Sequence, residues 1–299
     1  MDESEFLPTE TKQKIDADLA VRQQVHQANI ARLKAARMSA KTLGLAAPQQ
    51  QPLVMLAQGD SWFDYPLNGN NPTLQDTDTI AQLRRLGNLP PIILNQAHHG
   101  DTSVDEMSLT KQQRMIEAIT NENNWVDGKP DAILFSAGGN DVAGEQFCIF
   151  VDFNDGHAGG LNTDRFTKAL AAVEASYLEL FALRDRIASG VPIFGHCYDF
   201  PVPNGSHPIC AGPWLKPSLD FCGWSVAQGT KIVHDALANF RAMQMRLAGD
   251  PRNNFTLVDT QGTLAIADWA NELHPIPSGF VAVAQKFQKA LAKKFPGRI

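Results

Sequence analysis

The sequence predicts an α/β fold in which parallel strands form one sheet with helices on both of its faces. Short, continuous apolar runs recur along the chain, as is typical of strands that are buried on both faces. Between them lie longer segments whose apolar residues are three, four or seven positions apart, as on amphipathic helices. Strand and helix signals that alternate in this way indicate a parallel sheet.

The first fifty residues differ from this pattern. Residues 9–40 are rich in Ala, Gln, Lys and Glu and predict a helix, whose sparse apolar residues indicate a mostly solvated helix on the surface. Residues 46–52 have the composition of a linker. We therefore divide the chain into an N-terminal helical extension with its linker, residues 1–51, and one compact domain, residues 52–299.

The compact domain contains five expected strands and several expected helices. The strands are predicted at residues 53–56, 92–94, 132–135, 191–194 and 255–258, and helical periodicity is clear over 166–187, 233–247 and 280–291. Two inserts, residues 144–163 and 199–224, are rich in Gly, Asp, Pro or Trp and follow strands. Because the loops after parallel strands open on one edge of the sheet, we expect both inserts to line a pocket there.

Composition excludes several classes of protein. The net charge is −6 and no cluster of Lys or Arg stands out, which argues against a nucleic-acid partner. No apolar stretch approaches the roughly 20 residues of a membrane span. The acidic start has no apolar signal core, so we expect a cytoplasmic protein, with signal-independent export as the alternative.

The cysteines and histidines predict no metal site. The four cysteines are expected to be reduced, with a Cys210–Cys222 disulfide inside one insert as the alternative. The spacings of His98, His99, His196, Cys197 and His207 match no zinc motif. No glycine-rich nucleotide motif is present either, which argues against nucleotide binding.

Four short segments carry the chemical signal. Ser61 follows the first strand in Gly-Asp-Ser-Trp, and Gly100 follows the second in His-Gly-Asp. Asn140 follows the third in Gly-Gly-Asn-Asp, and His274 lies between the fifth strand and the last helix. A serine hydroxyl, an imidazole and the N–H groups of Ser61, Gly100 and Asn140 are the nucleophile, base and oxyanion donors of an acyl-transfer site.

Together, these segments resemble the SGNH hydrolase superfamily, also called GDSL lipases and esterases, over roughly residues 52–296. Ser61 matches the nucleophile of that family, with Trp62 where leucine is usual, and Gly100, Asn140 and His274 match its other three blocks in order. The resemblance implies a flavodoxin-like, three-layer α/β/α sandwich. It also implies hydrolysis of carboxylic esters through an acyl-enzyme on Ser61, without a metal or organic cofactor.

One position departs from the family pattern. The usual triad acid lies three residues before the histidine, where this chain has Asn271. A neutral amide cannot stabilise an imidazolium as a carboxylate does, and it can favour the wrong tautomer. Three interpretations remain: Asp268 takes the role, which we rank first; Glu272 takes it; or His274 acts in a dyad, oriented by a backbone carbonyl.

The expected substrate is a small ester, but its identity stays open among lipids, acetylated sugars and simple esters. Trp62 and His99 lie beside the expected site and are candidates for substrate contact. Two alternatives to a hydrolase remain: a catalytically silent fold of this type that binds a ligand or a protein, and an acyltransferase that uses the same site.

Overall fold

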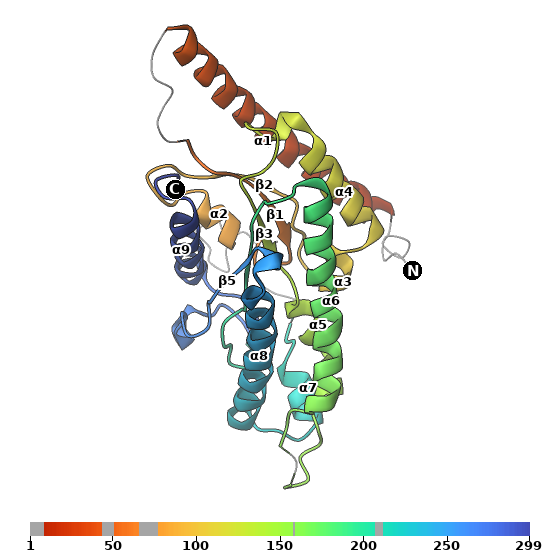
Figure 1. Cartoon of the computed structure of the whole chain (residues 1–299). Coiled ribbons are helices and arrows are strands. Elements are labelled where there is room, and N and C mark those ends of the chain that lie inside the picture. The colour runs from red at the N-terminus through yellow and green to blue at the C-terminus, as the bar shows by residue number, and fades with distance from the viewer. Residues whose placement is uncertain (1–8, 44–50, 66–76, 158, 207–211) are drawn as a thin grey trace.

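A computed structural model describes residues 9–43, 51–65, 77–157, 159–206 and 212–299 of the chain. Within these residues, five parallel strands form one sheet in the order β2-β1-β3-β4-β5 (Figure 1). The strands are β1 (Val54–Gly59), β2 (Ile92–Asn95), β3 (Ala132–Ser136), β4 (Ile193–His196) and β5 (Phe255–Val258). The sequence prediction of five parallel strands is therefore confirmed.

Helices cover both faces of the sheet, which gives the predicted three layers. On one face, α2 (Thr79–Leu83) packs against α9 (Pro277–Lys294). On the other face lie α3 (Ser103–Glu106), α4 (Leu109–Thr120), α6 (Thr163–Ile187) and α8 (Val226–Gly249) (Figure 1). The remaining short elements are α5 (Gly139–Val142), α7 (Lys216–Phe221) and the 3-10 turns η2 (Glu122–Asn124), η3 (Glu145–Phe150), η4 (Pro251–Asn253) and η5 (Ile266–Asp268).

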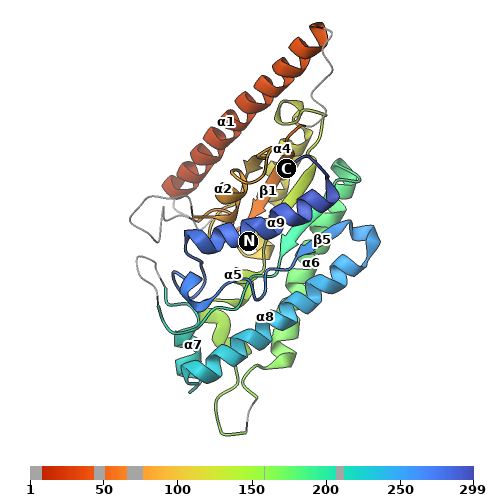
Figure 2. The same cartoon turned by 90° about the vertical axis from the view of Figure 1, so that its left-hand side faces the viewer.

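The N-terminal helix α1 (Thr9–Thr42) lies on the outside of the domain, as Figure 2 shows, and it packs against strand β2. Most of its described side chains are exposed or half-buried, as the sequence predicted. Two are buried: Ile30 joins the main core, and the His26 ring nitrogen Nε2 lies 2.8 Å from the Asn124 carbonyl oxygen. Helix α1 therefore contributes to the core; residues 46–50 of the expected linker lie outside the described part.

The strands end in polar residues that the apolar runs did not include. β1 continues through Gln58 and Gly59, β3 through Ser136 and β4 through His196, and all three polar side chains are buried. Strand β4 begins at Ile193, after Pro192, which has no N–H for a ladder bond. The sheet thus places polar groups at the edge where the carboxyl ends of its strands meet.

Among the helices of the described residues, none has the length and apolar character that a membrane span requires.

Candidate active site

Ser61 and His274 meet at the carboxyl edge of the sheet. The Ser61 hydroxyl oxygen lies 2.7 Å from Nε2 of His274, although 213 positions separate the two residues in sequence. Ser61 follows β1 in a single turn, in which the N–H groups of Phe63 and Asp64 both donate to the Asp60 carbonyl. No regular helix begins at this point. The contact is within range for proton transfer between a nucleophile and its base.

Close packing explains the glycine before this turn. A Cβ atom on Gly59 would lie 2.6 Å from the carbonyl oxygen of Ser136 on the neighbouring strand β3. The N–H of the next residue, Asp60, donates to that same carbonyl at 3.0 Å. Glycine therefore lets β1 approach β3 closely enough for the turn that carries Ser61 to be fixed to the sheet.

The other ring nitrogen of His274 faces Asn271. Its Nδ1 lies 3.1 Å from the amide oxygen Oδ1 of Asn271. The same oxygen accepts the backbone N–H groups of Leu273 and His274, each at 2.9 Å. Two backbone donors fix which end of the amide points toward the ring, because an NH₂ group cannot accept their hydrogen bonds.

This orientation determines the tautomer of His274. Since Oδ1 of Asn271 can only accept, Nδ1 must carry the proton, and Nε2 is left with a lone pair for the Ser61 hydroxyl. Asn271 therefore does what the triad acid does for ring orientation. It lacks the negative charge that stabilises an imidazolium.

Burial keeps the His274 ring neutral. Loss of solvent is the main cause that lowers its pKa to about 3, and the nearby His99 lowers it further. Aromatic rings surround it, with the Tyr65 ring centroid at 4.5 Å and that of Trp214 at 5.7 Å. At neutral pH the ring is thus available as a proton acceptor.

The two carboxylates proposed as the triad acid are occupied elsewhere. Asp268 accepts the N–H of Ala265 at 2.8 Å and caps the exposed turn η5. The buried carboxylate of Glu272 accepts four backbone N–H groups of the 199–224 insert, at 2.7–3.1 Å, from Gly205, Trp214, Leu215 and Lys216. The first-ranked prediction, that Asp268 is the third residue of the triad, is therefore wrong. The residue that contacts His274 is Asn271, at the position where the family usually has its acid.

Asn140 is held beside the loop that carries Gly100. Its amide Nδ2 donates to the Asp101 carbonyl oxygen at 2.8 Å, which leaves the second hydrogen of that group free to bind an oxyanion. The next residue, Asp141, accepts the N–H and the hydroxyl of Ser103, both at 2.7 Å. The second and third sequence blocks are thus fixed to each other.

The backbone N–H groups of Ser61 and Gly100 have no acceptor among the described residues. Gly100 is exposed and has a φ of +87°, a conformation that favours glycine. Both donors are therefore available to a ligand, although Gly100 does not line the main pocket.

A buried network behind Ser61 was not predicted from the sequence. The Asp60 carboxylate accepts the N–H of Trp62 at 3.0 Å, the hydroxyl of Ser136 at 2.7 Å and the hydroxyl of Tyr198. Burial raises the pKa of Asp60 to about 6, against the lowering effect of these hydrogen bonds. Tyr198 has a left-handed φ of 55°, which is uncommon for an aromatic residue. Asp60 therefore joins the turn that holds Ser61 to strand β3 and to the segment that follows β4.

A single arginine links helix α1 to the site. Arg22 donates to the carboxylate of Asp64 at 2.7 Å and to the Ala97 carbonyl oxygen at 3.2 Å. Asp64 lies three residues after Ser61, and Ala97 lies three residues before Gly100. Arg22 thus connects the loop of the nucleophile to the loop of the second block.

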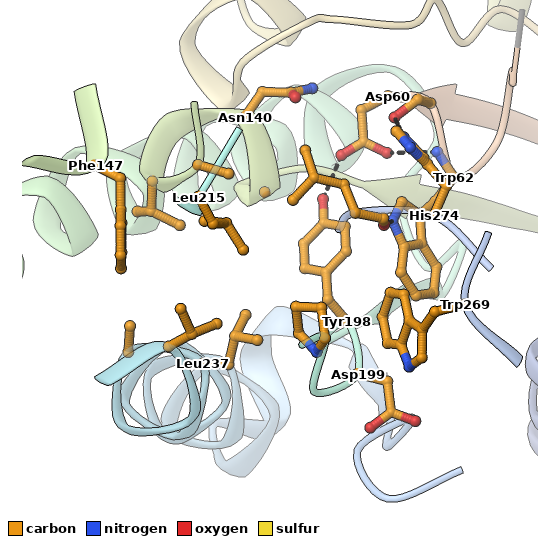
Figure 3. A pocket seen from close by; sticks show the side chains of 18 residues that line it. Asp60, Trp62, Asn140, Phe147, Tyr198, Asp199, Leu215, Leu237, Trp269 and His274 are labelled. Carbon is orange, nitrogen blue, oxygen red and sulfur yellow. Dashed lines mark hydrogen bonds between the residues drawn. The ribbon is translucent and has the colours of Figure 1, made fainter. Parts of the chain in front are cut away.

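A mostly apolar pocket opens from Ser61 and His274 (Figure 3). Its empty space is about 580 Å³, open mouth included. The expected substrate-contact residue Trp62 is in the wall, and its indole N–H donates to the Leu273 carbonyl at 3.1 Å. His99 is not in the wall; its half-exposed ring stacks on His98 with centroids 4.3 Å apart.

The described residues contain no cluster of three or more His, Cys, Asp or Glu side chains that could hold a metal ion. Cys148, Cys197 and Cys222 carry free thiols, and Cys210 lies outside the described residues.

Comparison with solved structures identifies the fold. The chain is similar to the lipase Lip_vut3 from a goat rumen metagenome, with 14% identity and a TM-score of 0.50 over 80% of this chain and 97% of that one. It is also similar to an extracellular lipase from Streptomyces rimosus (16% identity, TM-score 0.50, 79% and 98% coverage). A phospholipase A1 from Streptomyces albidoflavus is a third match (10% identity, TM-score 0.50, 80% and 99% coverage). No family model and no curated protein matches the chain by sequence. These similarities confirm the three-layer α/β fold that the resemblance implied.

Proposed function

We propose that this protein is a serine hydrolase that cleaves carboxylic esters through an acyl-enzyme on Ser61. The observation that carries the proposal is the 2.7 Å contact between the Ser61 hydroxyl and Nε2 of His274, at one end of an apolar pocket. The similarity in fold to three lipolytic enzymes supports it.

In the acylation half of the reaction, the Ser61 oxygen attacks the ester carbonyl carbon while its proton moves to Nε2 of His274. The carbonyl oxygen becomes an oxyanion near the N–H groups of Ser61 and Gly100 and the free amide hydrogen of Asn140. The C–O bond to the alcohol then breaks, and the proton on His274 passes to the departing oxygen. The ester has now become an acyl-enzyme and a free alcohol.

Deacylation repeats these steps with water as the nucleophile. His274 takes a proton from water, the resulting hydroxide attacks the acyl-enzyme, and the proton returns to the Ser61 oxygen as the acid leaves. Throughout, Asn271 fixes the ring so that Nε2 faces the reacting oxygen. Asn271 is in this account a positioning residue, and the buried imidazolium is stabilised by the oxyanion and the amide dipole alone.

Turnover of a p-nitrophenyl ester tests the proposal. We expect Ser61→Ala to lose all enzymatic turnover, while Ser189→Ala, which changes an exposed serine in the same way, keeps the wild-type rate. A Ser61→Ala protein with wild-type activity would contradict the assignment of the nucleophile. Absence of turnover in both the wild type and the control would favour the silent binding module, and ester formation with an added alcohol in preference to hydrolysis would favour an acyltransferase.

A further inference from the structure

The two ends of the pocket differ in chemistry. Figure 3 shows His274, Trp62 and Trp269 at one end and Phe147, Leu215 and Leu237 at the other. The second end is here called the distal end. Smaller apolar side chains, Val142, Ala143, Val233 and Ala236, also line the pocket. No charged residue lines that end among the described residues.

Both carboxylates of the wall are already hydrogen-bonded to the protein. Asp60 accepts three hydrogen bonds, one of them from the hydroxyl of Tyr198. The Asp199 carboxylate accepts the backbone N–H groups of Gly262, Thr263 and Leu264 at 2.6–2.8 Å. A sugar in the pocket would lose its hydrogen bonds to water and find few in return, which is unfavourable. Burial of an alkyl chain has no such cost, and it makes the free energy of binding more favourable.

The reaction geometry determines which half of an ester occupies the distal end. His274 must protonate the departing alcohol oxygen, so that oxygen has to lie within hydrogen-bond reach of Nε2. The alcohol part therefore lies on the side of His274. The acyl part extends from the carbonyl carbon in the other direction, past Asn140 and toward Phe147 (Figure 3).

We infer that the distal end is an acyl-chain site, so that the preferred substrates are esters of aliphatic acids longer than acetate. The inference rests on the proposed function and names its substrate class. Acetylated sugars, with a one-carbon chain beyond the carbonyl, leave the distal end empty.

The two inserts of the sequence supply the limit to chain length. Phe147, in η3, comes from the 144–163 insert, and Leu215 comes from the 199–224 insert. Leu215 is fixed because its N–H is one of the four that donate to the buried Glu272 carboxylate. The opposite wall, with Leu237, belongs to helix α8. Rigid walls of this kind select for chain length, since each methylene either fits or meets a side chain.

A chain-length series with one leaving group tests the inference. We expect kcat/KM for p-nitrophenyl esters to rise roughly fourfold per added methylene from acetate until the chain meets Phe147 and Leu237. Ala143→Leu, which adds bulk to the pocket wall four residues before Phe147, is expected to lower the ratio of octanoate to acetate turnover by at least about tenfold. Ala238→Leu, the same change at an exposed position of α8, is the matched control and should leave that ratio unchanged.

A variant in the opposite direction guards against a simple folding defect. Leu237→Ala, at a half-buried position, widens the distal end and should move the optimum to longer chains. A profile that is flat or highest at acetate in the wild type would overturn the inference, as would equal effects of Ala143→Leu and Ala238→Leu.

Binding of a non-reactive probe separates this inference from the proposed function. Octanamide, titrated against the intrinsic fluorescence of Trp62 and Trp269, should bind at least tenfold more tightly than acetamide, and Ala143→Leu should remove the difference. Tight octanamide binding without ester turnover would refute the hydrolase while retaining the chain site. Ester turnover with equal affinity for the two amides would refute the chain site while retaining the hydrolase.

Discussion

Replacing Asn271 with aspartate tests how this site works without a triad acid. The amide oxygen of Asn271 lies 3.1 Å from Nδ1 of His274, and the amide nitrogen donates to the Tyr65 hydroxyl at 3.2 Å. In Asn271→Asp the second carboxylate oxygen can accept a hydrogen bond from that hydroxyl, so the variant keeps the local geometry. The substitution adds a negative charge beside the His274 ring.

The size of the effect follows from this distance. A carboxylate within about 4 Å of an imidazole raises its pKa by about 1–3 units. The pKa of His274 is lowered to about 3 by burial, so in Asn271→Asp we expect a value of roughly 4–6. Because the base must be unprotonated, the acidic limb of kcat/KM should move to higher pH by the same amount. The imidazolium in the transition state is stabilised too, so the plateau rate should rise by about tenfold per unit.

The assay is the pH dependence of kcat/KM for a p-nitrophenyl ester from about pH 3 to 8, a range that reaches the acidic limb expected for the wild type. Asp60, whose pKa is raised to about 6 by burial, titrates in the same range in both proteins, so the difference between the two profiles isolates His274. Asn239→Asp adds the same charge at an exposed position of α8 and should leave the profile unchanged. An acidic limb that coincides in wild type and Asn271→Asp would refute the role given to Asn271.

Three further predictions follow from the contacts around the site. Asn140→Ala removes one oxyanion donor and should lower kcat by about 10²–10³ with little change in KM, and a change confined to KM would contradict its role. Glu272→Gln places an NH₂ group against backbone donors and should lower the free energy of unfolding, measured with urea, by about 1–3 kcal/mol; an unchanged denaturation midpoint would argue against this anchor. Arg22→Gln should reduce kcat severalfold because it separates the loops of Ser61 and Gly100, whereas Arg37→Gln, which breaks an exposed ion pair on the same helix, should not; equal losses would assign Arg22 to stability alone.

The fold could be predicted from the sequence because the strands are largely buried and each contains a continuous apolar run. The predicted strand at 255–258 coincides with β5, and the others differ from the structure by one to three residues at their ends. The differences concentrate at Gln58, Ser136 and His196, which extend their strands although they are polar. Hydrophobicity cannot reveal these residues, since their burial depends on partners from other segments of the chain: Ser136 donates to Asp60, and its oxygen lies 2.8 Å from Nε2 of His196.

The candidate site was predicted in part. The order of the motifs was enough to bring Ser61 and His274 together, since both lie after strands at the same edge of the sheet. The third residue was misjudged because a carboxylate was expected on chemical grounds. The spacing of three residues before His274 pointed to Asn271, and only the backbone donors at Leu273 and His274 show that its oxygen must face the ring.

Contacts between distant segments left no signal in the sequence. Glu272 is adjacent to Asn271, and the sequence is the same whether its carboxylate contacts the base or the insert. Its four backbone donors lie 56 to 67 positions earlier in the chain. In the sequence, Arg22 is likewise only one charge on an expected solvated helix. The structure shows that it contacts Asp64.

The most direct test of the central claim is covalent labelling by a fluorophosphonate, with the modified residue located by mass spectrometry of peptides. The reagent reacts with a serine only where a base activates the hydroxyl and donors hold the oxyanion. We predict a single adduct on Ser61 in the wild type, none in Ser61→Ala and strongly slowed labelling in His274→Ala. A wild-type protein that stays unlabelled, or that is labelled at another serine, would contradict the account.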